Sequence, residues 1–96
     1  GTRAQAMIEA LQNEGEAIPQ KGPLILVSGS TPQYPYSVFL IQGFKALRFA
    51  DHHLREALER PELEIQFVDE SAFKVEACQR PCSAYAWRAG QLVGLE

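Results

Sequence analysis

The sequence predicts a single domain of mixed α/β class, with a central mixed sheet of about four or five strands and two or three helices. Three observations predict this class: a continuous apolar run at Leu24–Val27, helical spacing of apolar residues on both sides of it, and alternating apolar residues after Pro61. The chain has 96 residues, the size of one domain. We expect residues 1–22 to form a helix and a linker, and residues 23–96 to form the mixed core.

The first half of the chain predicts a helix and then a buried strand. Apolar residues recur at helical spacing between residues 3 and 13, and Gly15 then supplies a C-terminal stop. The apolar run Leu24–Val27 lies between Pro23 and Gly29 and contains no polar alternation, which is typical of a strand covered on both faces. We therefore expect this strand at the centre of the sheet.

The stretch from Val38 to Pro61 predicts helix, because apolar residues recur at helical spacing until the proline ends the pattern. Ser37 is a suitable N-cap for its start. Two alternatives remain open. Either one helix runs to Arg60, or the helix breaks near Ala50 and a second helix, with Asp51 as its N-cap, follows over residues 52–59.

The second half predicts strands. Apolar residues alternate over 63–67, which predicts a half-buried strand parallel to the first one, because a helix separates the two. Residues 73–77 also alternate and predict a hairpin partner, with a helix over 72–79 as the alternative. Alternation over 84–87 before the turn 88–91 predicts a C-terminal hairpin. We expect these hairpins to extend the sheet in the antiparallel direction.

Charge and hydropathy argue against two classes of partner. The formal net charge is −3, and the basic residues never form a run, so we expect no nucleic-acid binding. The longest apolar run, Val38–Ile41, is far shorter than the roughly 20 residues that a membrane span needs, so we expect no membrane association. No signal-peptide pattern opens the chain, and two cysteines are too few for a disulfide scaffold. A cytoplasmic location is therefore expected.

Two segments carry a family resemblance. After the apolar strand come Ser28-Gly29-Ser30-Thr31-Pro32-Gln33-Tyr34-Pro35, and near the end stand Tyr85-Ala86-Trp87-Arg88-Ala89-Gly90-Gln91-Leu92-Val93-Gly94. In these segments the chain resembles a monothiol glutaredoxin of the thioredoxin superfamily. The resemblance implies a thioredoxin-like fold, with a cis-proline that only Pro81 can supply. It also implies a loss of redox chemistry, because Tyr36-Ser37-Val38-Phe39 stands where the family has its reactive cysteine.

Cys78 and Cys82 form the only cysteine cluster. We expect buried structural thiols, since free cysteine commonly behaves as a small buried hydrophobe. A redox-responsive pair is the alternative, because a turn can bring two Cα atoms to the separation of about 5.5 Å that a disulfide needs. A third alternative is that the two cysteines act as metal ligands. Zinc needs further ligands, and neighbouring His52 and His53 on a helix would point about 100° apart, so we expect no metal.

The loop after the first strand carries the predicted interaction site. Prolines intervene before the next helix and no lysine follows, so a phosphate-binding loop is disfavoured and no cofactor is expected. Tyrosines on a proline-stiffened loop provide contact area at low entropic cost, which suits a protein interface. The predicted interaction residues are Gln33, Tyr34, Tyr36 and Ser37.

From these observations we expect a non-catalytic protein-binding or regulatory module, whose partner is another protein or a second copy of the chain. Two other functions remain open. One is a thiol-dependent redox protein that uses Cys78 and Cys82, and the other is a small-ligand-binding domain at the loop 28–36.

Overall fold

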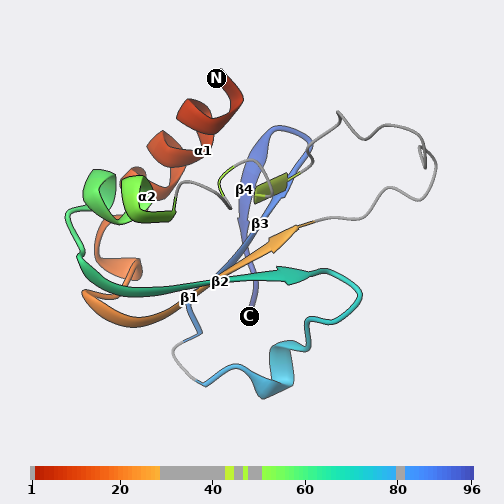
Figure 1. Cartoon of the computed structure of the whole chain (residues 1–96). Coiled ribbons are helices and arrows are strands. Elements are labelled where there is room, and N and C mark those ends of the chain that lie inside the picture. Colours follow the sequence, from red (N-terminus) through yellow and green to blue (C-terminus); the bar gives the residue numbers. More distant parts are fainter. Residues whose placement is uncertain (1, 29–42, 45–46, 48–50, 80–81) are drawn as a thin grey trace.

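A computed structural model of the chain describes residues 2–28, 43–44, 47, 51–79 and 82–96. Two α-helices and four strands make up most of this part, and two short 3-10 helices lie in the connections (Figure 1). The elements are α1 (Thr2–Asn13), η1 (Gly15–Ala17), β1 (Lys21–Ser28), α2 (Asp51–Leu58), β2 (Glu62–Asp69), η3 (Val75–Ala77), β3 (Ala84–Arg88) and β4 (Gln91–Gly94). The predicted mixed α/β class is confirmed. Among the described residues, no helix is both long and apolar enough to span a bilayer.

The four strands form one mixed sheet in the order β2-β1-β3-β4. β1 pairs in parallel with β2 over its whole length, from Lys21 opposite Glu62 to Ser28 opposite Asp69. This confirms that the first apolar strand is central and parallel to the second. β3 is also parallel to β1, and only β4 runs antiparallel to its neighbour. The expectation that the later strands extend the sheet antiparallel is therefore wrong for β3.

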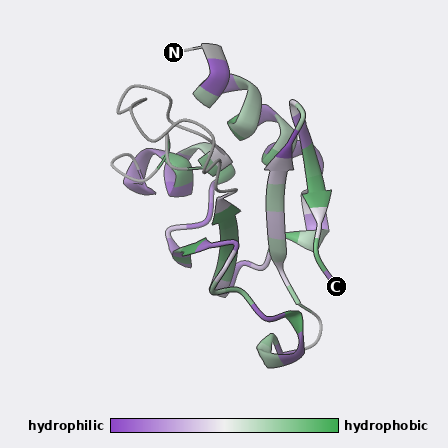
Figure 2. Cartoon of the chain, turned by 90° about the vertical axis from the view of Figure 1, so that its right-hand side faces the viewer, coloured by the Kyte–Doolittle hydropathy of each residue, from purple (hydrophilic) through white to green (hydrophobic). Residues whose placement is uncertain are grey.

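The helices and η3 lie on opposite sides of the sheet (Figure 1). Figure 2 shows the same arrangement, with α1 and η3 at opposite ends of the view and with hydrophobic residues gathered on the strands. Leu24 and Leu26 point toward the helices and are fully buried. They pack there with residues of both helices, of the other strands and of the segments that connect them: Met7, Leu11, Ile18, Phe44, Leu47, Leu54, Leu58, Leu63 and Tyr85. We call this side of the sheet the helix face, and the other side the second face.

Pro23 lies inside β1 without interrupting it. The N–H of Ile25 donates to the carbonyl of Ser83, so Ile25 and every second residue of β1 point their backbone groups toward β3. Pro23 is one of these alternate residues, but β3 pairs with β1 only from Ile25 onward. The N–H that proline lacks is therefore not needed, and the ladder with β2 stays complete.

Of the two alternatives for the Val38–Arg60 stretch, the separate second helix is confirmed. Gly43 has a φ of 56°, a left-handed conformation that a continuous α-helix cannot contain. α2 begins at Asp51 and ends at Leu58. The residue that follows, Glu59, is left-handed with a φ of 59°. The N–H groups of residues 59 and 60 then donate to the carbonyls of residues 56 and 55, which is a Schellman motif. The predicted helix start at Ser37 and Val38 lies outside the described residues.

The segment after β2 is neither the predicted hairpin strand nor the alternative helix over 72–79. The N–H groups of Ala72 and Phe73 donate to the carbonyl of Asp69 and form a turn, and η3 follows. Among the described residues, no strand pairs with the outer edge of β2, so this segment does not join the sheet. It crosses the second face instead, where Phe73 and Val75 are half-buried.

The predicted C-terminal hairpin is confirmed. Arg88 and Gln91 pair across a two-residue loop. Both loop residues, Ala89 and Gly90, have positive φ, at 51° and 75°. Such a primed turn has the twist that neighbouring antiparallel strands need, which makes the short connection between β3 and β4 possible.

Candidate functional site

A groove of 720 Å³ lies on the second face of the sheet. Its floor is formed by β1 and β2, through Pro23, Ile25 and Gln66. Ile25 and Gln66 are partners in the parallel register, so they lie side by side on this face. Ile25 is only half-buried although β1 is central, because the helices cover the other face of the strand.

The first wall of the groove is the linker between α1 and β1, represented by Glu16, Ala17 and Pro19. This linker is held against the start of β3. The hydroxyl of Ser83, which also lines the groove, donates to the carbonyl of Ala17 at 3.4 Å. The carbonyl of Ser83 accepts from the N–H of Ile25 at 2.8 Å. These contacts tie the first wall and β3 to the floor.

The second wall is the segment Ala77–Gln79, at the end of η3. None of the η3 residues is buried, and no side chain caps the short helix. Cys78 ends it through an N–H bond to the carbonyl of Val75 at 3.0 Å. Neither a buried η3 side chain nor a side-chain cap therefore anchors this wall.

Cys78 and Cys82 form a disulfide, with their Cα atoms 5.5 Å apart. The expectation of buried free thiols is wrong, because both residues are half-buried and covalently paired. The spacing of the two cysteines in the sequence allowed this bond as the alternative. The disulfide joins the Ala77–Gln79 wall to the residue that precedes Ser83, and so to the start of β3.

The groove carries little charge. Glu16 is the single ionisable side chain among its lining residues in the described part of the chain, and it is exposed. Lysine and arginine are missing from that lining. A phosphate or carboxylate ligand would therefore find no cation among the described lining residues to pair with. Gln66 in the floor and Gln79 in the wall offer amide donors and acceptors.

The two histidines form a solvated surface pair on α2. Their rings lie 3.8 Å apart between centroids, so they are closer than the helical spacing suggested. His53 lies 3.8 Å from the carboxylate of Glu56, and Arg55 binds Asp51 at 3.1 Å. The described residues contain no group of three or more histidine, cysteine, aspartate or glutamate side chains that could hold a metal ion.

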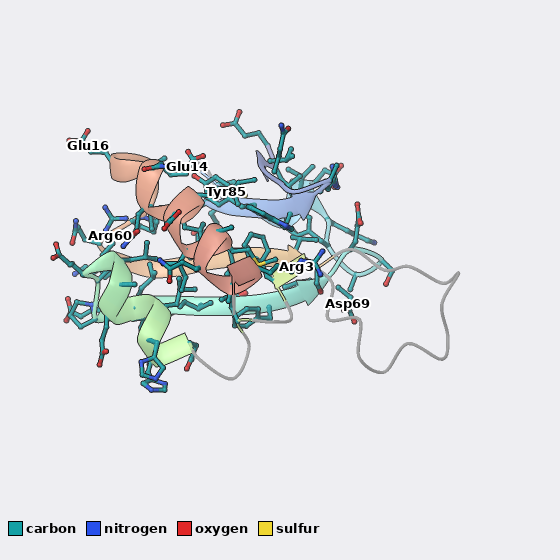
Figure 3. All side chains as sticks on the ribbon, turned by 90° about the horizontal axis from the view of Figure 1, so that it is seen from above. Arg3, Glu14, Glu16, Arg60, Asp69 and Tyr85 are labelled. Carbon is teal, nitrogen blue, oxygen red and sulfur yellow. A yellow bond between two sulfur atoms is a disulfide. The ribbon has the colours of Figure 1, made fainter. Side chains whose placement is uncertain are left out.

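One buried tyrosine has a shifted pKa. Tyr85 on β3 faces α1, and Glu14 lies beside it just after that helix (Figure 3). Burial raises the pKa of the Tyr85 phenol above its ordinary value, and the negative charges of Glu14 and Glu96 raise it further. Tyr85 belongs to the core on the helix face, and the groove lies on the second face.

The predicted interaction residues, Gln33, Tyr34, Tyr36 and Ser37, lie outside the described residues, as does Pro81. Sequence analysis did not single out Ile25, Gln66 or Gln79 as site residues. Their chemistry gives no local signal, because the groove combines segments that range from residue 16 to residue 83. Only the cysteine pair, which borders the groove, was singled out by its spacing.

Comparisons of the chain with protein-family models, with curated proteins and with solved structures found no match.

Proposed function

We propose that this chain is a non-catalytic protein-binding module that binds an extended peptide segment of another protein in the groove on the second face. The observation that carries this proposal is the groove itself, a 720 Å³ open site that brings together the floor of β1 and β2 and two separate walls. Its volume falls within the range of about 300–1,000 Å³ that is typical of ligand sites.

The lining favours a peptide over other ligands. Ile25 and Pro23 provide an apolar floor for side chains, and the amides of Gln66 and Gln79 match the alternating donors and acceptors of a peptide backbone. The described lining residues include no cation, which disfavours nucleotides, phosphates and other anions. Glu16 at the rim adds a preference for a peptide with a basic residue.

A matched pair of substitutions tests the groove. Peptides are first selected from a displayed random library against the oxidised chain, and their affinity is then measured by fluorescence anisotropy. Ala77→Arg places a long side chain into the groove, whereas Ala72→Arg changes an equally exposed alanine of the same connection outside it. We expect Ala77→Arg to weaken binding about tenfold or more, a loss of about 1.4 kcal/mol, and Ala72→Arg to leave it unchanged. Equal effects of the two substitutions would contradict the groove as the binding site.

The predicted loop site at Tyr34 and Tyr36 and the thioredoxin-like relationship remain predictions of the sequence. The cytoplasmic location also remains a prediction. A stable disulfide is more typical of oxidising compartments, so alkylation of free thiols in freshly lysed native cells, followed by a non-reducing gel, is the relevant measurement.

The disulfide favours a second candidate function, a thiol-dependent redox protein that uses Cys78 and Cys82. This function requires catalysis of disulfide exchange. Reduction of insulin by dithiothreitol, followed by turbidity, provides the test. If the chain accelerates insulin reduction and Cys78→Ser abolishes this acceleration, the redox function is supported. An unchanged rate of insulin reduction would exclude it.

A further inference from the structure

The Cys78–Cys82 disulfide joins the Ala77–Gln79 wall of the groove to the start of β3. On one side, Cys82 is followed by Ser83 and β3, which are bonded to Ile25 and Ala17. On the other side, Cys78 ends η3, whose residues are not buried and whose side chains make no cap. The covalent bond therefore joins a fixed part of the fold to a weakly held one.

The far end of this wall has its own attachment. The carbonyl of Asp69 accepts the N–H groups of Ala72 and Phe73, and the carboxylate of Glu70 pairs with Arg88 on β3. Between this turn and Cys78, the described residues form the two backbone hydrogen bonds of η3, which close a single 3-10 turn. Breaking the disulfide would thus leave the Ala77–Gln79 wall joined to Cys82 by the main chain alone, and would leave the floor intact.

We propose that this disulfide is a redox switch for the groove: the oxidised chain holds the Ala77–Gln79 wall in place, and reduction releases the wall and weakens peptide binding. The inference rests on the proposed function, since it concerns the same groove. Both cysteines are half-buried, and Cys78 lines the groove directly, so a thiol reductant can reach the bond.

The reaction is a two-electron exchange with a dithiol. One thiolate of the dithiol attacks a sulfur of the disulfide and forms a mixed disulfide. Its second thiolate then closes the reductant's own disulfide. The S–S bond of the chain breaks, both cysteines leave as thiols, and the two protons come from the thiols of the reductant.

Hydrogen exchange measures the release of the wall without any ligand. The wild-type chain is compared before and after dithiothreitol, together with the double variant Cys78→Ser/Cys82→Ser. We expect faster exchange at the amides of Ala77 and Cys78 on reduction, with exchange in β1 and β2 unchanged. The double variant should resemble the reduced chain and should not respond to dithiothreitol. Equal exchange in oxidised and reduced wild type would overturn the switch, and so would a response of the double variant.

Peptide affinity measures the consequence. The probe is the peptide selected against the oxidised chain. Its affinity is compared between oxidised and reduced wild type, so the test does not depend on the folding of the double variant. If about one reduced molecule in ten keeps the wall in place, the apparent dissociation constant rises about tenfold. If Ala77→Arg weakens peptide binding but the oxidised and reduced chains bind the peptide equally, the redox switch is overturned and the groove remains the binding site. Binding that resists Ala77→Arg would contradict the groove, and the proposed function with it.

Discussion

The guanidinium of Arg88 on β3 donates a hydrogen bond to the carboxylate of Glu70, at 2.5 Å. This ion pair joins the end of β3 to the first residue after β2, and so holds the start of the connection that crosses the second face. The disulfide holds the other end of the same connection.

The Arg88–Glu70 pair should contribute little to stability, because both side chains remain about half exposed to solvent. We expect a double-mutant cycle of Arg88→Ala and Glu70→Ala to give a coupling energy of about 0–1 kcal/mol in urea denaturation. The Arg55–Asp51 pair within α2 provides a matched control of the same chemistry. A coupling of several kcal/mol would mean that the pair, and not only the disulfide, fixes this connection.

Neighbouring residues of β1 should differ in their contribution to the core. Leu26 is fully buried on the helix face, whereas Ile25 is half-buried on the second face. We expect Leu26→Ala to lower the free energy of unfolding by about 2–5 kcal/mol. Ile25→Ala should lower it by clearly less, because it leaves a smaller cavity, but should weaken binding in the groove. Equal losses of stability would contradict the assignment of the two faces.

Glu59 should be replaceable by glycine with a gain in stability. Its φ of 59° lies in the left-handed region, which costs a residue with a Cβ about 1 kcal/mol or more. Glycine has no such cost but loses more chain entropy on folding. We expect Glu59→Gly to raise the free energy of unfolding by up to about 1 kcal/mol, measured by thermal or urea denaturation. Glu59→Ala keeps the Cβ and should give no such gain.

Tyr85 should make stability depend on alkaline pH. Its pKa in the fold is raised above the ordinary value of 10.0, mainly by burial, so the folded state favours the neutral phenol. This contribution is fully present below pH 10.0 and is lost as the pH rises through the folded pKa. We expect stability to fall in that range, and Tyr85→Phe to reduce the dependence. An identical alkaline profile for both chains, in denaturation curves taken at several pH values, would contradict this.

Tyr34 and Tyr36 provide the test of the site predicted from sequence. If they form an interface, Tyr34→Ala or Tyr36→Ala should weaken partner association by about 1–3 kcal/mol and leave the melting temperature almost unchanged. A core tyrosine would instead lower the stability by about 3–5 kcal/mol. Binding and thermal denaturation are measured on the same variants. Ready unfolding of both variants, with no selective loss of a partner, would place the interface elsewhere.

The elements that local pattern specifies were predictable from the sequence. The spacing of Met7 and Leu11 gave α1, the unbroken run at Leu24–Val27 gave a central strand, and the alternation in 63–67 gave β2. Each pattern reflects which side chains one element must bury, and a few neighbouring residues are enough to reveal it. The parallel pairing of β1 with β2 followed from the helix between them.

The region after β2 shows what local pattern leaves open. Phe73 and Val75 alternate as in a strand, and both are half-buried, yet the segment forms a turn and a 3-10 helix. The outer edge of β2 carries no strand among the described residues, and the turn at Asp69 takes the segment across the second face instead. Alternation cannot specify which distant strand pairs or in which direction.

The sequence by itself therefore determined the class of the fold, its central strand and its C-terminal hairpin, because periodicity and turn residues act over short distances. Only the tertiary structure decided the direction of β3, the pairing of Cys78 with Cys82 and the groove between them and the sheet. The groove depends on segments as far apart as Glu16 and Ser83, and the direction of β3 depends on its pairing with β1, so both exist only once the sheet has assembled.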